Sequence, residues 1–345
     1  MNEAQEHPDS VKLIQKLRQS SGQSGQLNYR DFSRIALYDP EFGYYRKNTT
    51  RVGRSDQADF YTSQSLGPIF GALVTDAISQ ILETHVEKSV ALKDWTLVEV
   101  GYESETGWWT ESECPFAKVV RIGPSDEPDF SGRCVVFSNE LFDAQPFHRI
   151  VYLDSEWREL GVDVAGEELR EVFLTELSSE VKEFQSHLPL GTEEGYQLDL
   201  PLGTRPLLKQ LTGSRWSGLF LALDYGKSWD QLSHDFPQGT ARAYFKHKQS
   251  PNLIDQPGMQ DLTCHICWDW LQEGLDEVGF ESITLESQEA FFVKHAGSCI
   301  QKIVTANAGQ FDPLRQSLMQ LIHPATMGQQ FQVLWGYRPE SYLVD

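Results

Sequence analysis

Apolar residues recur at spacings of three and four in several parts of the chain, which is the pattern of amphipathic helices. The most regular run predicts a deeply buried helix over residues 65–83, with Ser65 as its cap. Asn28 is a suitable N-cap for a second helix. The other expected helices cover residues 10–19, 29–37, 258–279, the acidic stretch 167–187 and the residues after Pro313.

Short apolar runs between these helices predict buried strands, and their mixture with helices is typical of an open α/β sheet. The expected strands cover residues 95–100, 118–122, 134–138, 218–223, 239–247, 282–285 and a final strand around Val333. Residues 149–153 and 156–160 are expected to form a hairpin at the start of an insertion, 148–216. The segment 108–133 is too short for two long crossover helices, so this part of the sheet is expected to be trimmed.

The loop after the first buried strand has only part of the sequence pattern of a cofactor-binding loop. Gly101 follows the strand directly, and Glu99 lies at its end. Such a loop usually continues with further glycines, because only glycine lets backbone amides approach a nucleotide closely. Glu103 and Glu105 stand where those glycines are expected. The loop is therefore acidic where a close, amide-lined surface is the usual pattern.

Two later strands also run into polar, acid-bearing turns. Residues 139–146 read Asn-Glu-Leu-Phe-Asp-Ala-Gln-Pro, and residues 224–226 read Asp-Tyr-Gly. Ligands of open α/β sheets bind at the carboxyl ends of the strands, so these turns are candidate functional positions.

Charge and composition narrow the class of protein. The 345 residues include 50 acidic and 29 basic side chains, a net charge of −21, which repels nucleic acid and anionic membranes but allows a basic protein partner. The amino terminus lacks the pattern of a signal peptide and no run of eighteen apolar residues occurs, so a cytoplasmic protein without membrane insertion is expected. Five cysteines fit a reducing compartment, and Cys264-His265-Ile266-Cys267 lacks a second ligand pair, so no metal is expected.

Several separated segments resemble one family, the MidA-like proteins, which includes a mitochondrial complex I assembly methyltransferase. They occur in family order over nearly the whole chain. The matching segments are 38–45 (Tyr-Asp-Pro-Glu-Phe-Gly-Tyr-Tyr), Asp59-Phe60 with 67–71, 139–146, 224–226, 239–247, 261–263 with His265, and Met327-Gly328.

The resemblance implies a class I methyltransferase fold, a Rossmann-like doubly wound α/β sheet with an added helical and hairpin subdomain. It also implies S-adenosylmethionine as cofactor and protein arginine as substrate, with a respiratory-complex subunit as one suggested partner. The implied domains are a helical segment at 1–90 that covers the cofactor cleft, a core at 91–147 and 217–345, and the insertion at 148–216. The family places an acid for the ribose near Arg121, so this chain departs from the pattern there.

Candidate site residues follow from the strand ends together with the resemblance. Carboxylates can hold and deprotonate a guanidinium, so the catalytic candidates are Glu140, Asp143 and Asp224. The cofactor-binding candidates are Glu99, Gly101, Asp59, Phe60, Thr62 and Asn139, and the substrate-binding candidates are Tyr225, His247 and His265.

Several of these residues have a structural alternative. Glu140 could cap a turn, Asp143 could start a helix and Glu99 could face a basic side chain. Phe60 could be a core aromatic, and each histidine could be satisfied by a neighbour. Two functions stay open on this basis: an S-adenosylmethionine-dependent protein methyltransferase, or a methyltransferase fold that has lost its cofactor and binds a protein as an assembly factor. Glu103, Glu105 and Arg121 favour the second, whereas the acid-bearing strand ends favour the first.

Overall fold

The computed structural model describes residues 8–46, 67–86, 90–102, 114–124, 126–246, 248–306 and 312–343. The chain packs as two compact units. The first contains the described residues of Met1–Phe60, Phe142–Pro206 and Lys227–Cys267. The second contains those of Tyr61–Leu141, Leu207–Gly226 and Trp268–Asp345.

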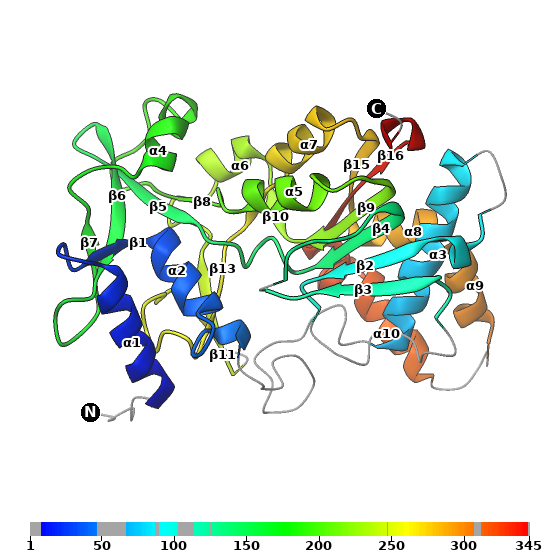
Figure 1. Cartoon of the computed structure of the whole chain (residues 1–345), viewed down its shortest axis with the longest axis horizontal. Helices are drawn as coiled ribbons and strands as arrows, with labels where there is room; N and C mark the ends of the chain where they lie inside the picture. Colours follow the sequence, from blue (N-terminus) through cyan, green and yellow to red (C-terminus); the bar gives the residue numbers. More distant parts are fainter. Residues whose placement is uncertain are drawn as a thin grey trace. The chain divides into compact units, whose positions relative to one another are not determined.

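The second unit is built on a six-stranded sheet (Figure 1). Four neighbouring strands run parallel, and β16 is antiparallel to the strand on each side of it. In spatial order the strands are β15 (Glu281–Ser287), β16 (Gln332–Arg338), β9 (Trp216–Asp224), β4 (Gly132–Asn139), β2 (Thr96–Val100) and β3 (Lys118–Ile122).

The strand order reverses beside β2. The chain passes from β2 to β3 on one side and then returns to place β4 on the other side. Such a reversal leaves a crevice at the carboxyl ends of the two central strands, where ligands of this architecture bind. No helix lies between β3 and β4 in the described residues of this connection, 123–124 and 126–131. The trimming expected over 108–133 is confirmed for this connection, whereas residues 108–113 lie outside the described part of the chain.

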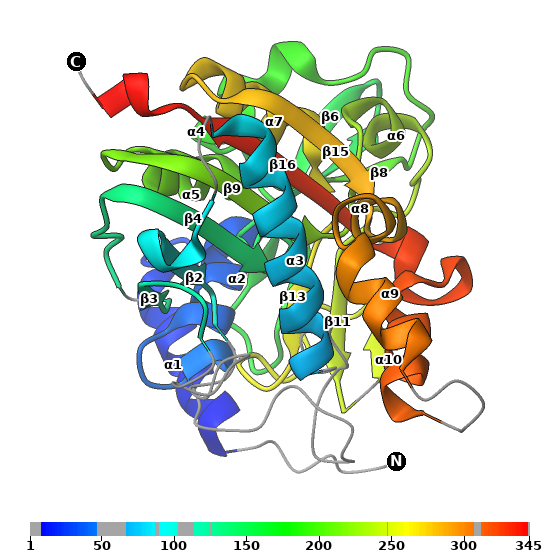
Figure 2. The ribbon, with the colours of Figure 1, turned by 90° about the vertical axis from the view of Figure 1, so that its right-hand side faces the viewer.

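Helices cover both faces of this sheet. On one face α3 (Pro68–His85) packs with α8 (Gln288–His295) and α10 (Pro313–Ile322) over the odd-numbered side chains of β9, as Figure 2 shows for α3. Helix α9 (Gly297–Thr305) packs beside α3. The other face carries α7 (Trp268–Glu277), and Phe280 after it packs edge-on against Trp216 and Phe220. This is the expected doubly wound α/β sheet.

The first unit contains two smaller antiparallel sheets. The larger has the order β1 (Gln26–Asn28), β6 (Glu156–Asp163), β5 (His148–Leu153) and β8 (Gln197–Leu200), with β7 (Arg170–Phe173) also paired to β6. The smaller has the order β12 (Lys248–Ser250), β11 (Arg242–Phe245) and β13 (Asp261–Thr263). The remaining elements are α1 (Pro8–Ser20), α2 (Tyr29–Tyr38), α4 (Ser179–Phe184), α5 (Thr204–Thr212), α6 (Trp229–His234), and the paired β10 (Gly226–Lys227) and β14 (Ile266–Cys267).

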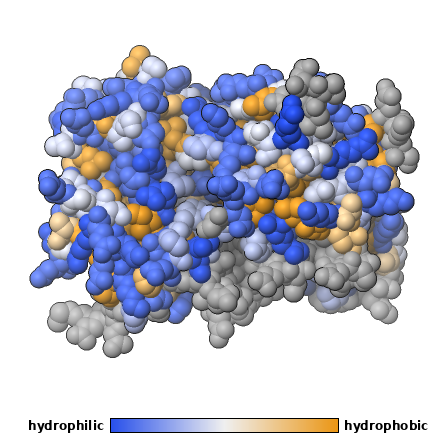
Figure 3. Space-filling view, viewed as in Figure 1, coloured by the Kyte–Doolittle hydropathy of each residue, from blue (hydrophilic) through white to orange (hydrophobic). Residues whose placement is uncertain are grey.

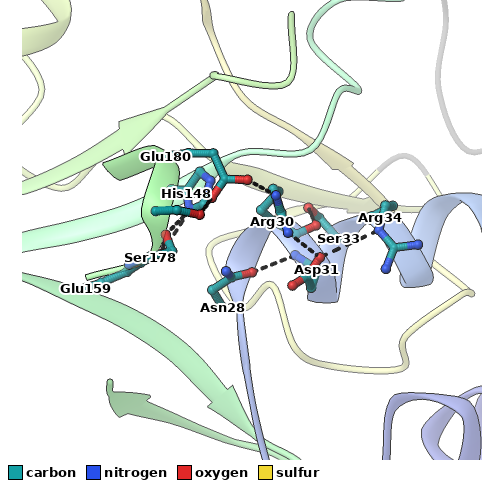
Figure 4. Close-up of polar contacts among 10 residues, drawn as sticks. Asn28, Arg30, Asp31, Ser33, Arg34, His148, Glu159, Ser178 and Glu180 are labelled. Carbon is teal, nitrogen blue, oxygen red and sulfur yellow. Dashed lines mark hydrogen bonds and ion pairs between the residues drawn. The ribbon is translucent and has the colours of Figure 1, made fainter. Parts of the chain in front are cut away.

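Polar contacts fix α2 within its unit. Its N-cap is Asn28, as expected, because the Asn28 side chain accepts a hydrogen bond of 2.8 Å from the backbone N–H of Asp31. Arg30 forms an ion pair with Glu180 of α4 and a second with Asp31 (Figure 4). The helix is therefore tied to an element about 150 residues later in the sequence.

Several expected elements differ from the structure. The acidic stretch 167–187 is not one helix, because it contains strand β7 and only the short helix α4. The helix expected from Gly258 begins at Trp268, and residues 261–263 form a strand. The strand expected over 239–247 covers Arg242–Phe245. The proposed cap Ser65 lies outside the described residues, and α3 begins at Pro68 after Gly67.

The expected three-part division, with a cleft-covering segment at 1–90 and an insertion at 148–216, is a functional division and stays a prediction. In the packing, residues 142–206 group with the described amino-terminal residues up to position 46 and with residues 227–267. Within the described residues, no helix combines the length and the apolar character needed to cross a membrane.

Candidate functional site

The carboxyl ends of β2, β4 and β9 bring six of the predicted residues to one edge of the second unit. The register pairs Glu99 with Phe137 and Asn139 with Leu223, so Glu99, Asn139 and Asp224 lie near the ends of adjacent parallel strands. All three side chains are buried. Glu140 and Gly101 follow directly after β4 and β2. The strands therefore gather acceptor groups at the edge where the strand order reverses.

Gly101 makes the tight turn that ends β2. Its φ is 71°, a left-handed conformation that favours glycine, and its N–H donates a hydrogen bond of 2.9 Å to the carbonyl of Ile122. A Cβ at this position would come within 2.7 Å of Leu141 Cδ1. The glycine expected at the start of the cofactor loop is thus required by the backbone and by packing, while Glu103 and Glu105 lie outside the described residues.

Glu99 faces a cation from the neighbouring strand. The parallel register places Arg121 beside it, and Arg121 Nε lies 3.2 Å from Glu99 Oε2. The Glu99 side chain is 4% exposed, so a charge partner compensates much of the cost of burying the carboxylate. The structural alternative for Glu99, a strand-end acid facing a basic residue, is therefore present. Its role in cofactor binding stays a prediction.

Asn139 and Glu140 form a polar pair at the end of β4. Asn139 Nδ2 donates a hydrogen bond of 3.0 Å to Glu140 Oε1, and Glu140 N–H donates one of 2.9 Å to the carbonyl of Leu223. Glu140 has a φ of 50°, a left-handed backbone conformation that is uncommon for residues other than glycine. Asn139 Oδ1 is buried and has no hydrogen-bond partner among the described residues. A buried acceptor of this kind is suited to a ligand donor.

Asp224 ends β9, where its carboxylate accepts a hydrogen bond of 2.8 Å from the N–H of Tyr225. The following N–H, that of Gly226, donates to the side-chain oxygen of Gln332 at 3.2 Å. The turn after β9 is thus held by side chains, and Asp224 is completely buried. Asp224 and Tyr225 are placed at the strand-end edge, as the strand pattern predicts.

A second polar cluster lies in the first unit. It consists of Tyr38, Tyr45, Asp143 and Asp261. The Tyr38 and Tyr45 rings are stacked with centroids 5.4 Å apart, and the Tyr45 hydroxyl donates a hydrogen bond of 2.8 Å to Asp261 Oδ1. The Tyr38 hydroxyl donates to the carbonyl of Ala144 at 3.0 Å. Both aspartates are buried, and neither starts a helix.

The two tyrosines of this cluster are held in their neutral form. Burial, followed by the negative charge of Asp261, raises the pKa of Tyr38 and of Tyr45 well above the ordinary value. Asp143 contributes in the same direction to both. The hydroxyls therefore act as hydrogen-bond donors. Two carboxylates beside two neutral rings form a site suited to a cation such as a guanidinium.

His265 is a half-buried residue of the first unit. Its ring lies edge-on to Phe236 with centroids 5.6 Å apart. Burial, followed by the charges of Lys227 and Arg242, lowers the pKa of His265 to about 4. At neutral pH it is therefore an uncharged hydrogen-bonding group. Its role in substrate binding stays a prediction.

We expect this histidine to make the protein less stable in acid. In the unfolded chain a histidine takes up a proton near pH 6.5, whereas His265 does so in the folded protein only near pH 4. Between these values the unfolded state binds more protons, so stability falls as the pH decreases. The His265→Gln variant should lose about 3 kcal/mol less than the native chain between neutral pH and pH 4, measured by urea unfolding. Equal losses in the two proteins would contradict this assignment.

The structure does not test every predicted site residue. Asp59, Phe60, Thr62 and His247 lie outside the described residues, and their roles stay predictions. The boundary between the two units falls between Glu140 and Asp143, and their joint role in holding a guanidinium stays a prediction. In the described contacts, Glu140 pairs with Asn139, and Asp143 lies in the cluster with Tyr38, Tyr45 and Asp261.

Sequence reasoning missed Asp261, Tyr38 and Tyr45 as site residues, and it did not pair Arg121 with Glu99. Tyr38 and Tyr45 belong to the aromatic turn 38–45, and Asp261 belongs to a family-like segment, so both signals were present in the chain. Their contact joins residues 216 positions apart, which no local pattern indicates.

Comparison with known proteins finds matches over most of the chain. Residues 66–285, more than half of the chain, match the family described as "Putative S-adenosyl-L-methionine-dependent methyltransferase". A Drosophila melanogaster protein named protein arginine methyltransferase NDUFAF7 homolog, mitochondrial, is 22% identical over 93% of this chain and 84% of its own length. The Danio rerio protein arginine methyltransferase NDUFAF7, mitochondrial, is 24% identical over 90% of this chain and 83% of its own length.

Solved structures agree on the fold. A Burkholderia thailandensis protein crystallised with S-adenosylhomocysteine superposes with a TM-score of 0.79 at 21% identity, over 96% of this chain and 92% of that chain. A native crystal structure from the same species has a TM-score of 0.75 at 20% identity, with the same coverage. At these identities the likeness shows the fold alone, and it confirms the expected methyltransferase architecture. The chain belongs to the MidA-like family of S-adenosyl-L-methionine-dependent methyltransferases.

Proposed function

We propose that the protein binds S-adenosylmethionine and transfers its methyl group to a guanidinium nitrogen of an arginine in a partner protein. Family membership supports the reaction class. The observation that carries the cofactor assignment is the buried Asn139 Oδ1, which has no hydrogen-bond partner among the described residues and lies where the strand order reverses. The relatives named as protein arginine methyltransferases support the substrate class.

The residues at the strand-end edge fit the donor groups of this cofactor. Glu99 and Asn139 offer buried oxygen acceptors, and Gly101 allows close approach of the backbone. These three residues would hold the nucleoside and amino-acid parts of the cofactor. The bound cofactor supplies an electrophilic methyl group on a sulfonium centre. Asp59, Phe60 and Thr62 stay predicted cofactor-binding residues.

The chain's own carboxylates would prepare the substrate. Asp143 and Asp261, with the rings of Tyr38 and Tyr45, form an acidic and aromatic site for the planar guanidinium. A carboxylate that accepts a proton from the reacting nitrogen makes that nitrogen a nucleophile. Glu140 and Asp224 stay candidates for this step. Tyr225, His247 and the neutral His265 stay candidates for positioning the substrate.

The ion pair between Glu99 and Arg121 favours a second candidate function, a cofactor-less fold that binds a protein as an assembly factor. Arg121 stands where the family places a ribose acceptor, and it occupies one oxygen of the nearest carboxylate. A respiratory-complex subunit as partner stays a prediction under either function, as does a cytoplasmic location. The two curated relatives are named as mitochondrial proteins.

Calorimetric titration with S-adenosylmethionine and with S-adenosylhomocysteine separates the two functions. Micromolar binding of both, about −8 kcal/mol, supports the enzyme. No heat of binding up to millimolar ligand would reject it and leave the binding function. Methylarginine in hydrolysed protein substrates, after incubation with radiolabelled cofactor, tests the substrate class.

We expect the Arg121→Gln variant to bind S-adenosylmethionine about threefold to tenfold more tightly than the native chain. The substitution frees the Glu99 carboxylate and removes a positive charge from the neighbourhood of a cationic ligand. S-adenosylhomocysteine lacks the sulfonium charge and should gain less. Weaker binding of both ligands would instead identify Arg121 as a cofactor-binding residue.

A further inference from the structure

A pocket of about 600 Å³ lies in the first unit, within residues 152–190. The β5–β6 hairpin, the loop after β7 and the turn after α4 form its walls. None of its lining residues belongs to the strand-end edge or to the cluster of Tyr38, Tyr45, Asp143 and Asp261. The pocket is therefore a separate feature that the proposed methyl transfer does not use.

The pocket has aromatic walls and an exposed apolar rim. The Tyr152 and Trp157 rings meet edge to face with centroids 5.2 Å apart, and Trp157 Nε1 donates a hydrogen bond of 3.3 Å to the carbonyl of Pro189. Phe173 and Leu190 line the pocket and are 51% and 97% exposed. Single exposed apolar residues are ordinary on a protein surface, and Figure 3 shows several on a largely hydrophilic face. Phe173 and Leu190 differ because both border the same cavity.

The segment that forms the pocket is acidic. Residues 154–194 carry twelve acidic and three basic side chains, which is a large share of the net charge of −21. Glu156 and Glu176 line the pocket, with side chains 65% and 78% exposed. Glu156 forms an ion pair with Arg158, which also lines the pocket, and Glu176 forms one with Lys182. Twelve acids against three bases leave the segment with a net excess of nine negative charges, which favours cations over anions.

Hydrogen bonds fix the shape of the walls. Asp154 and Ser155, at the tip of the β5–β6 hairpin, have φ values of 52° and 65° and donate their N–H groups to the Glu194 carboxylate at 2.9 and 3.0 Å. Glu159 lines the pocket from β6 and is held by Ser178 and His148, as Figure 4 shows. A cavity held in this way is formed before a ligand binds, which lowers the entropic cost of binding.

We propose that this pocket docks a basic segment of a partner protein. A large apolar side chain of the segment enters between Trp157, Phe173 and Leu190, and flanking Lys or Arg side chains meet the surrounding carboxylates. Charge selects the occupant, because the acidic excess of residues 154–194 would repel an acidic segment and would add nothing to the binding of an uncharged one. The aromatic walls suit the flanking cations as well as the apolar anchor. Docking does not depend on methyl transfer, so it holds for either candidate function.

Fluorescence anisotropy of the full chain with a labelled peptide of Arg, Lys and Leu tests the proposal. We expect saturable binding that weakens with added salt, and at least about tenfold weaker binding of the Phe173→Ser/Leu190→Ser variant. Both side chains are exposed, so the double variant should fold normally, which circular dichroism checks. A peptide with Ser in place of Leu should show the same loss on the native chain.

A matched control separates docking from general attraction of a cation to an acidic protein. The Val304→Ser/Leu314→Ser variant removes two apolar side chains, each 52% exposed, from helices of the second unit, and it should bind as the native chain does. Equal weakening in the two double variants would overturn the proposal. So would equally tight binding of a peptide with Glu in place of Arg and Lys, or no saturable binding of the basic peptide.

Discussion

Replacing Asp199 with Ala is expected to lower the free energy of unfolding by about 3–5 kcal/mol. Asp199 is 1% exposed, and its Oδ1 accepts a hydrogen bond of 2.7 Å from Arg149 Nε. Its Oδ2 accepts two more from the N–H groups of Thr240 and Ala241, at 2.7 and 2.8 Å. Without the carboxylate, two buried N–H groups lose their partner, and the buried Arg149 guanidinium is left with its longer ion pair to Glu171, at 3.6 Å. Urea unfolding followed by circular dichroism measures the change.

The matched control is Asp230→Ala. Asp230 lies in the same unit, but its side chain is 90% exposed, so no measurable change in stability is expected. A loss below about 1 kcal/mol for Asp199→Ala would mean that water or a rearranged Arg149 replaces the lost contacts.

The same carboxylate explains why the predicted strand over 239–247 begins late. Gly239 has a φ of 65°, and a Cβ there would lie 2.2 Å from Asp199 Oδ2. The N–H groups of residues 240 and 241 point to Asp199 and not to a neighbouring strand. A regular ladder can therefore start only at Arg242. Asp199 is about 40 positions away in the sequence, so the apolar pattern of the strand could not indicate this.

The sequence correctly predicted the elements that are specified by local patterns of apolar and capping residues. The spacing of apolar residues in α3 and the apolar run of β2 are strong patterns, and Asn28 was predicted as the N-cap of α2 from its residue type. The prediction of one helix over 167–187 was wrong. The acidic composition of this stretch favours a helix, but residues 170–173 pair with β6 and form a strand. Tertiary pairing overrode local propensity there.

The residues of the candidate site also fall into those that local patterns predict and those that they do not. The ends of β2, β4 and β9 carry Glu99, Asn139 and Asp224, and their position could be predicted because parallel strands end at one edge. The pairing of Arg121 with Glu99 depends on the register of β3 against β2, which the sequence does not specify. The contact of Tyr45 with Asp261 depends on the packing of α2 and its following turn against β13. Each missed residue is thus defined by a contact between distant segments.

Replacing Asp261 with Asn is expected to lower the rate of protein methylation about a hundredfold. The substitution removes one of the two negative charges that face the proposed guanidinium site, while the amide oxygen still accepts the hydrogen bond of Tyr45. Binding of S-adenosylhomocysteine should stay unchanged, because the proposed cofactor contacts are made by Glu99, Gly101 and Asn139 and not by Asp261. Initial rates of radiolabelled methyl incorporation and calorimetry measure the two effects.

A change confined to the rate would assign Asp261 to the substrate, because a general loss of structure would also weaken cofactor binding. The Asp230→Asn variant makes the same chemical change at an exposed position of the same unit and should keep the native rate. If Asp261→Asn also methylates protein at the native rate, the cluster of Tyr38, Tyr45, Asp143 and Asp261 holds the fold together and does not bind the guanidinium. Glu140 and Asp224 would then be the carboxylates to replace next, since they are the remaining acids proposed for the reacting nitrogen.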